Sequence, residues 1–139
     1  MSEGAISITP FDKKNLKPAS YILTLGRTLR RLKTVPELDS RVDPEVEEFE
    51  IPLEGYSIQP NEHVLGITAE IVALNDKYAC SLSNRAGLAM LGLDVSQSSF
   101  YCEPDTTHAY TMEMTNNGPF PIRLHVGLRI AKAIFMEVS

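Results

Sequence analysis

One guanidinium group and two carboxylates within a single stretch of this sequence, residues 84–113, could together handle a phosphorylated substrate. Arg85 stands before a short leucine-rich turn, and Glu103 and Glu113 follow it ten positions apart. The planar, permanently charged guanidinium of arginine suits phosphate oxygens, and a partly desolvated glutamate can act as a general base. We therefore interpret this stretch as the skeleton of a nucleotide site, in which the small residues around the charged groups decide whether chemistry survives.

Short strands separated by turn residues must position these groups, so the sequence predicts an all-β fold. Turns recur at a spacing of roughly ten residues, which is typical of a jelly roll or a related sandwich. The length of 139 residues fits a single domain covering residues 1–139. The clearest expected strands cover residues 19–25, 64–74, 78–82, 108–114 and 129–138, and Gly26 is expected to end the first of them.

One short helix is expected after the third of these strands. Asn84 is a plausible N-cap and Gly92 a plausible C-terminal stop. Leu88 and Leu91 lie three residues apart, which predicts that both face the buried side of the helix. This helix would carry Arg85 in its first turn.

The strand expected at residues 108–114 gives Glu113 a defined direction. His108, Tyr110, Met112 and Met114 would share one face of that strand, while Glu113 would lie on the other face among small residues. Such a position leaves room for a ligand, as a general base requires. The alternative is an ordinary surface glutamate on an amphipathic strand, and the pattern alone leaves both open.

Composition limits the partners of this chain. The net charge is −5, which argues against a broad surface for the nucleic-acid backbone, because such a surface needs clustered lysines and arginines. No apolar run approaches the roughly 20 residues that span a bilayer, and the first residues lack the basic-then-apolar form of a signal peptide. We therefore expect no nucleic-acid partner, no membrane partner and a cytoplasmic location.

Two charged segments and two cysteines have plain structural interpretations. Residues 37–50 are strongly acidic and are expected to form an exposed excursion. The basic cluster from Arg27 to Lys33 is expected to be a solvated face or a subunit contact. Cys80 and Cys102 show no metal-ligand spacing, and we expect buried free thiols rather than a disulfide or a reactive site.

The sequence carries no recognisable metal motif. Zinc deaminases need a His-x-Glu and a Pro-Cys-x-x-Cys motif to hold a metal hydroxide, and neither occurs here. No protein-held metal or other cofactor is therefore expected. Any Mg²⁺ would arrive on a nucleotide triphosphate and be held mainly by phosphate oxygens.

Several segments, in their order and spacing, resemble the dCTP deaminase-like branch of the dUTPase superfamily. The opening Pro-Ala-Ser-Tyr-Ile-Leu-Thr-Leu-Gly at residues 18–26 is similar to the usual Pro-Ala-Ser-Tyr-Asp-Leu-Arg-Leu-Gly of that family. The turn at 59–62, the Thr-x-Glu strand at 68–70, the turn at 115–119 and Gly-Leu-Arg-Ile at 127–130 resemble further family segments. The resemblance covers most of the chain. It implies a distorted jelly-roll subunit of the dUTPase-like β-clip type, a homotrimer, and active sites between subunits.

The same resemblance implies roles for individual residues. Arg85 corresponds to the arginine that contacts nucleotide phosphates, and Glu113 to the catalytic glutamate that activates water for attack on C4 of cytosine. Glu103 corresponds to an aspartate that helps bind the sugar and, in bifunctional members, serves diphosphate hydrolysis. The implied reaction is hydrolytic deamination of dCTP to dUTP in pyrimidine deoxynucleotide metabolism, with dUTP diphosphatase activity as a possible addition. The remaining positions of the implied nucleotide site are Ala86, Gly87, Ser98 and Ser99.

The chain also departs from the family pattern at these positions. Ala86 and Gly87 replace two serines, and Ser98-Ser99 replaces a Thr-Ala that lines the base pocket. Other family residues are replaced as well: an arginine by Met90, a first-strand aspartate by Ile22 and a glycine by Asp105. The sequence ends at Ser139, whereas relatives continue with a tail that closes over the nucleotide. Since one lost polar group can cost about 10²–10³-fold in rate, these changes predict weakened chemistry.

Three functions therefore stay open at the level of sequence. The first is a nucleotide enzyme that deaminates dCTP and also hydrolyses dUTP in a bifunctional form. The second is a catalytically inactive relative that binds a nucleotide or a protein partner and regulates. The third is a trimer with a structural or assembly role.

Overall fold

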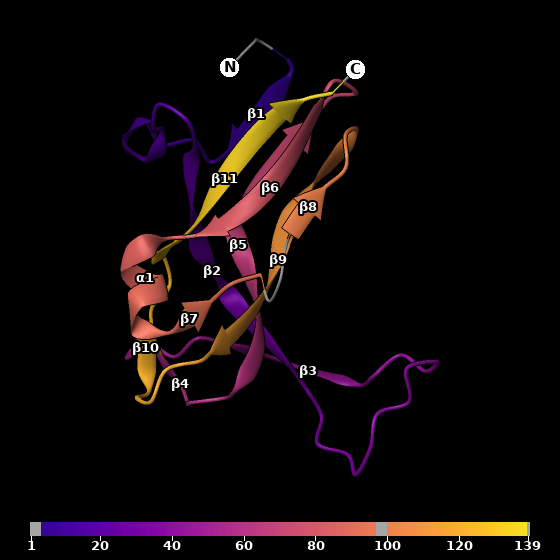
Figure 1. Ribbon diagram of the computed structural model, residues 1–139, viewed down its shortest axis with the longest axis vertical. Coiled ribbons are helices and arrows are strands. Elements are labelled where there is room, and N and C mark those ends of the chain that lie inside the picture. The colour runs from indigo at the N-terminus through magenta and orange to yellow at the C-terminus, as the bar shows by residue number, and fades with distance from the viewer. Residues whose placement is uncertain (1–3, 97–99, 139) are drawn as a thin grey trace.

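The structure is a computed structural model that describes residues 4–96 and 100–138, and its regular secondary structure is almost entirely β-strand (Figure 1). The prediction of an all-β fold with one short helix is confirmed. Within the described ranges, no helix has the length and apolar character needed to cross a membrane. The elements in chain order are β1 Ile6–Thr9, η1 Lys13–Asn15, β2 Tyr21–Leu32, β3 Val46–Glu50, β4 Tyr56–Ile58, β5 His63–Leu74, β6 Tyr78–Asn84, α1 Ala86–Leu91, β7 Leu93–Asp94, β8 Phe100–Cys102, β9 Thr106–Asn116, β10 Ile122–Leu124 and β11 Arg129–Glu137.

One curled antiparallel sheet forms the body of the molecule. Its strands follow the order β7-β9-β5-β2-β11-β6-β8, with β1 also paired to β5 and β3 also paired to β2. A separate two-stranded sheet joins β10 to β4. The inward faces of these strands form a continuous apolar core, which includes the fully buried Tyr21, Leu23, Tyr110, Met112 and Ile130.

Strand β5 reaches across this sheet because it bends in the middle. Its pairing with β9 shifts register between Ile67 and Ile71. At the bend, the Thr68 hydroxyl donates to the carbonyl of Glu70 (2.9 Å) and accepts from the backbone N–H of Tyr110 (2.9 Å). The Glu70 carboxylate, also buried, accepts from the backbone N–H and the hydroxyl of Thr24. These bonds satisfy the backbone groups that the bulge removes from the ladder.

The prediction that Gly26 ends the strand expected at residues 19–25 was wrong, because this strand, β2, continues to Leu32. The pairing of β2 with β5 shifts register beyond Leu25, and Gly26 lies in that irregular stretch. A Cβ atom at Gly26 would lie 2.7 Å from the carbonyl oxygen of Ile67. The glycine therefore permits close approach of two backbones inside a strand.

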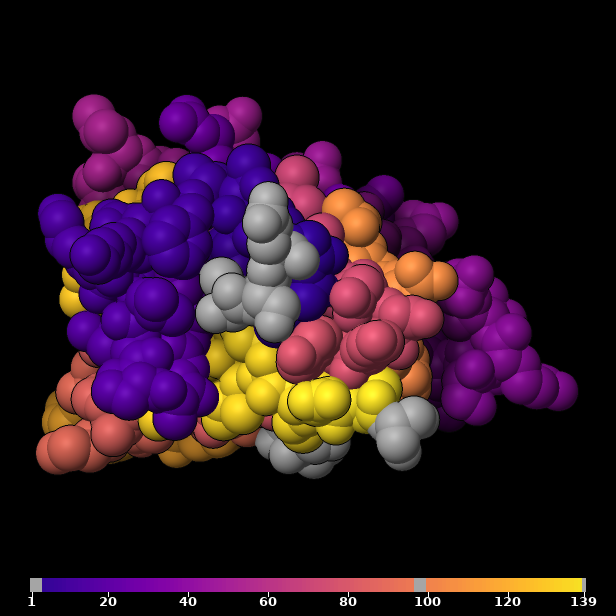
Figure 2. All heavy atoms as spheres, turned by 90° about the horizontal axis from the view of Figure 1, so that it is seen from above, coloured from indigo at the N-terminus to yellow at the C-terminus, as the bar shows by residue number. Residues whose placement is uncertain are grey.

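The acidic excursion is confirmed as an exposed feature, and part of it is a strand. We call residues 33–50 the arm; it projects from the body beside β2 (Figures 1 and 2). Strand β3 pairs with the end of β2 and places acids opposite the basic cluster. The ion pairs are Arg30–Glu48 (3.0 Å), Arg31–Glu47 (2.7 Å), Lys33–Glu45 (3.2 Å) and Arg27–Glu50 (4.0 Å). All of these side chains are well exposed, so each pair contributes little stability, about 0–1 kcal/mol.

The two cysteines are buried free thiols, as predicted. Cys80 and Cys102 stand opposite each other on β6 and β8. Burial raises the pKa of the Cys80 thiol to about 12. Since the thiolate is the reactive form, Cys80 is unreactive at neutral pH.

Replacing Thr68 tests the contribution of the bulge. Thr68→Val keeps the side-chain shape but removes the hydroxyl, which leaves the N–H of Tyr110 and the carbonyl of Glu70 without this partner. We expect the free energy of unfolding to fall by about 2–4 kcal/mol, measured by chemical denaturation. The matched control is Thr111→Val on the exposed face of β9, expected to change stability by less than about 0.5 kcal/mol. Equal effects of the two substitutions would contradict this role for Thr68.

Candidate functional site

Arg85 lies where β6 passes into α1. It is the N-cap residue of the helix, its backbone is extended, and its side chain is half-buried. Its Nη1 donates to the carbonyl of Arg129 at the start of β11 (3.0 Å). This bond fixes one side of the guanidinium and leaves other N–H groups available for an anion.

The prediction that Asn84 caps the helix was wrong, since Asn84 is the last residue of β6. Its side-chain oxygen accepts instead from the backbone N–H of Val95 (2.9 Å), and its Nδ2 donates to Asp94 (3.3 Å). The amide is thus used to hold the segment that follows the helix. A short polar residue directly after a strand was the sequence signal for both roles, and it did not distinguish them.

Helix α1 is held mainly by its ends. Gly92 closes it in the left-handed conformation (φ 107°), as predicted, and its N–H bonds back to the last turn. None of the helix residues is buried, so the prediction for Leu91 was wrong: this side chain is 55% exposed. Leu88 alone packs against the edge of the core. Leu91, the last residue of the helix, lines an open cavity with Pro119 and Phe120 instead of contacting the core.

Glu113 lies on β9 as the sequence predicted. Tyr110, Met112 and Met114 point into the core, whereas Glu113 is on the opposite, exposed face. Glu113 pairs with Leu65 on one side and forms a single parallel bridge with Ser96 on the other. Its side chain is therefore open to solvent within a single chain.

Residues 93–96 connect the surroundings of Arg85 and Glu113. Strand β7 pairs with the end of β9 next to Glu113, and the Val95 N–H bonds to Asn84, the neighbour of Arg85. The structure thus brings Arg85 and Glu113 to two sides of one short segment, and among the described residues no hydrogen bond or ion pair joins them.

Glu103 lies at the opposite end of β9. It follows β8 and precedes Thr106, whose hydroxyl donates to the Glu103 carbonyl (2.9 Å). The seven residue steps of β9 from Thr106 to Glu113 span about 23 Å. Within one chain, Glu103 and Glu113 are therefore separated along the strand (Figure 1).

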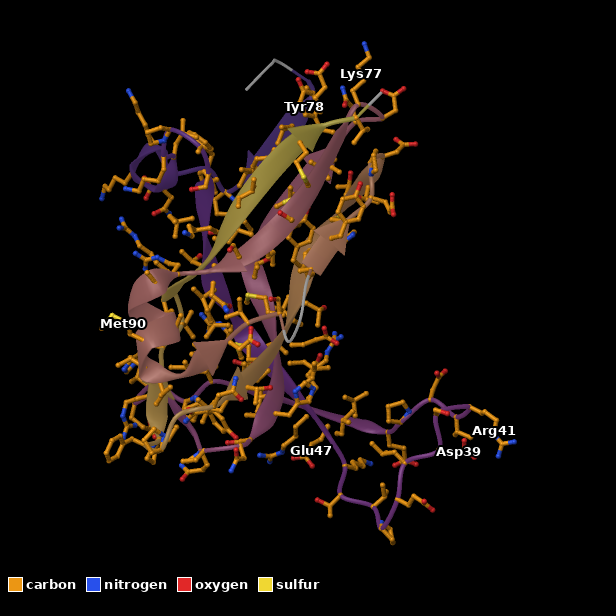
Figure 3. The ribbon with its side chains drawn as sticks, in the orientation of Figure 1. Asp39, Arg41, Glu47, Lys77, Tyr78 and Met90 are labelled. Atoms are coloured by element: carbon orange, nitrogen blue, oxygen red, sulfur yellow. The ribbon has the colours of Figure 1, made fainter. Side chains whose placement is uncertain are left out.

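Three of the positions that depart from the family pattern have a clear structural setting. Asp105 has a positive φ of 64°, a conformation in which glycine carries no penalty and aspartate is tolerated. Ile22 is buried in the core. Met90 is 87% exposed and points outward from α1 (Figure 3).

Two of the four small residues of the implied site lie within the described residues. Ala86 and Gly87 lie exposed in the first turn of α1, and neither offers a hydroxyl. Ser98 and Ser99 fall outside the described residues. In the ranges that the structure covers, no group of three His, Cys, Asp or Glu side chains is arranged to hold a metal ion.

Comparison with known proteins assigns the family. A sequence model of the family described as dCTP deaminase-like matches residues 1–138. The dUMP-forming dCTP deaminase of Clavibacter michiganensis is 30% identical over 144 residues, covering 100% of this chain and 72% of the relative. The corresponding enzyme of Dictyoglomus thermophilum is 31% identical over 152 residues, covering 100% of this chain and 76% of the relative. This chain therefore belongs to the dCTP deaminase-like family.

Two solved structures define the fold. The 2'-deoxycytidine 5'-triphosphate deaminase from Agrobacterium tumefaciens superposes with a TM-score of 0.74 at 17% identity, over 96% of this chain and 43% of that one. A Staphylococcus bacteriophage 80alpha dUTPase superposes with a TM-score of 0.63 at 12% identity, over 98% of this chain and 92% of that one. The expected dUTPase-like fold is confirmed. The chain spans less than half of the Agrobacterium protein.

Gly92 offers a test of how α1 is positioned. A Cβ atom there would lie 2.4 Å from the backbone nitrogen of Gly118, and the backbone is left-handed. We expect Gly92→Ala to lower the free energy of unfolding by about 2–4 kcal/mol, measured by chemical denaturation.

The matched control is Gly87→Ala in the same helix, where a Cβ atom would meet nothing within 4 Å. It is expected to raise stability by up to about 1 kcal/mol, because alanine favours helix. A Gly92→Ala protein as stable as the control would show that the contact with Gly118 does not constrain the end of α1.

Proposed function

We propose that this protein is a nucleotide enzyme that binds dCTP and deaminates it hydrolytically. The observation that carries the proposal is the retention of Arg85 and Glu113 on either side of residues 93–96, in a chain of the dCTP deaminase-like family. Arg85 would bind the triphosphate and Glu113 would activate water. Ala86, Gly87, Ser98 and Ser99 would line the remainder of the nucleotide site.

In the proposed reaction, Glu113 takes a proton from a water molecule while the water oxygen bonds to C4 of cytosine. The electron pair of the C4=N3 double bond moves to N3, and Glu113 passes the proton to N3. The C4–N4 bond of the tetrahedral intermediate then breaks as its hydroxyl proton is transferred to the amino group, so dCTP and water give dUTP and ammonia. A general base contributes typically 10²–10⁴-fold to such a step. Mg²⁺, where present, would accompany the triphosphate as part of the substrate, with no ligands from the protein required.

A second hydrolytic step is included in the proposal, because relatives of this chain are dUMP-forming. Forming dUMP requires release of diphosphate in addition to deamination. Glu103 is the proposed acid for that step and for sugar contacts. Its distance from Glu113 along β9 supports a site completed by a neighbouring subunit, in which Glu103 of one chain would approach Arg85 and Glu113 of another.

A homotrimer is accordingly part of the proposal. The exposure of Glu113 in the single chain supports it, since a neighbouring subunit and bound nucleotide would supply the desolvation that a general base needs. A cytoplasmic location belongs to the same proposal.

A regulatory protein without catalytic activity is the second candidate. The exposed first turn of α1 favours it, because Ala86 and Gly87 present no hydroxyl to a bound base or water. One structural relative is a phage dUTPase of a kind described as controlling transfer of virulence genes. Under this alternative the nucleotide would bind through Arg85 without being converted. A trimer with a purely structural role would bind no nucleotide at all.

Assay with dCTP and dUTP in the presence of Mg²⁺ distinguishes these functions. We expect release of ammonia from dCTP by the purified protein. Glu113→Gln should lower the deamination rate by about 10²–10⁴-fold with little change in dCTP affinity. Arg85→Ala should mainly weaken nucleotide binding, measured by calorimetry.

The control substitution is Glu137→Gln, an exposed glutamate at the end of β11, expected to leave both rate and affinity unchanged. Binding of dCTP without turnover would favour the regulatory function. If the protein neither binds nor turns over dCTP, the proposal is overturned and the structural role is left.

A further inference from the structure

The tip of the arm carries apolar side chains that the chain itself leaves uncovered. Leu38 is 56% and Val42 65% exposed, and Val35 and Val46 are exposed as well. Leu38 lies between Glu37 and Asp39, and Val42 lies between Arg41 and Asp43. Asp39 and Arg41 pair with each other (2.9 Å), which leaves Glu37 and Asp43. Among the described residues these two acids form no ion pair or hydrogen bond through their side chains, in contrast to Asp39 and the β3 glutamates.

A complementary groove lies beside α1 and β10. It is a cavity of about 530 Å³, which we call the groove, lined by Met90, Leu91, Pro119, Phe120, Pro121, Ile122 and Arg123. Phe120 is 74% exposed, so the lining is apolar and open. The only charged residue of this lining is Arg123. Its Nη1 donates to the carbonyl of Glu54 (3.0 Å), and it pairs with no carboxylate of the described chain.

The arm and the groove lie on opposite sides of the molecule, so the arm of a chain cannot cover the groove of the same chain. Met90 marks the groove on one side of Figure 3, and Asp39 and Arg41 mark the tip of the arm on the other. Two uncovered apolar surfaces on one subunit are typical of protein interfaces. Their separation means that each must meet a second molecule.

Charge decides which surfaces meet. Five of the seven acids of the arm are ion-paired within the chain. Glu37 and Asp43 are the two that carry no ion pair among the described residues, so two arm tips that met face to face would place like charges together. The groove offers the unpaired guanidinium of Arg123. An arm therefore fits a groove better than it fits another arm.

We propose that the arm of one copy of this chain docks in the groove of a second copy, with Leu38 and Val42 against Phe120 and with Glu37 and Asp43 facing Arg123. Such a contact uses different surfaces on the two partners and is therefore heterologous, so it closes into a ring when the rotation between copies permits. This inference deepens the proposed homotrimer and names the surfaces that would close it. It also places the arm of one subunit beside the helix that carries Arg85 of the next.

The test uses one substitution on each surface, Leu38→Asp and Phe120→Asp, in the full chain. Both positions are exposed, so folding should be retained, which thermal melting checks. By sedimentation equilibrium or light scattering, we expect the unmodified protein to be a trimer and each variant alone to be a monomer. The matched control, Leu16→Asp at an exposed apolar position after η1, should stay trimeric.

Mixing the two variants gives the decisive result. The Phe120→Asp chain keeps a good arm and the Leu38→Asp chain keeps a good groove, so a 1:1 mixture should form heterodimers joined by one intact contact. An isologous interface, which uses the same surface of both partners, would not restore association in this way. Monomers that stay monomeric on mixing would overturn the pairing of arm with groove.

A charge exchange provides a second readout. Arg123→Glu should weaken association by about tenfold, and combining it with Glu37→Lys and Asp43→Lys should recover most of that loss. Failure of the combined variant to recover would contradict the proposed facing of these groups.

The outcomes separate this inference from the proposed function. If the unmodified protein is trimeric and both aspartate variants remain trimeric, the arm–groove contact is overturned while the trimer stands. If the unmodified protein is monomeric at the protein concentrations at which it deaminates dCTP, both the arm–groove contact and the site shared between subunits are overturned. Absence of deamination by an intact trimer would overturn only the proposed reaction and leave the arm–groove contact standing.

Discussion

A single buried hydroxyl holds the bend on which the sheet depends. Thr68 links the carbonyl of Glu70 to the N–H of Tyr110 where β5 changes register against β9. On either side of this bulge β5 pairs with β9, and it also pairs with β2 at one end and with β1 at the other. Strand β9, whose register depends on β5, in turn determines the direction of Glu113.

The same construction separates the charged groups of the candidate site. Arg85 is fixed by the start of α1 and by Arg129, Glu113 by the outer face of β9, and Glu103 by the turn at the far end of that strand. Under the proposed function, a single chain would supply these groups separately, and neighbouring subunits would bring them together.

Much of this arrangement could be predicted from the sequence, because strict alternation is a strong signal. The alternation in β9 placed Tyr110, Met112 and Met114 inside and Glu113 outside, and the structure agrees. Turn residues also placed both ends of β5 to within one residue and the start of β6 at Tyr78, whereas β6 continues two residues beyond its predicted end. Gly92 was identified as the end of α1 because glycine adopts the left-handed backbone that closes a helix without a steric penalty, and Gly92 has this conformation.

The predictions that were wrong share a physical cause, because tertiary contacts override the local conformational preference of a residue. Asn84 has the properties of an N-cap, but its amide bonds across to Val95. Gly26 has the properties of a strand end, but it serves a close approach of backbones inside β2. Leu91 fits a buried helical position, yet the core touches α1 on one side only. No local pattern reports where a distant strand or loop will lie.

We propose that Arg85 and Glu113 belong to one nucleotide site, and a crystal structure of the Glu113→Gln protein with dCTP would test this. We expect the triphosphate on Arg85 and the cytosine ring with C4 beside residue 113 in the same site, whether that residue comes from the same or a neighbouring subunit. Nucleotide bound away from Arg85, or with its base remote from every copy of residue 113, would show that the two residues do not share a site.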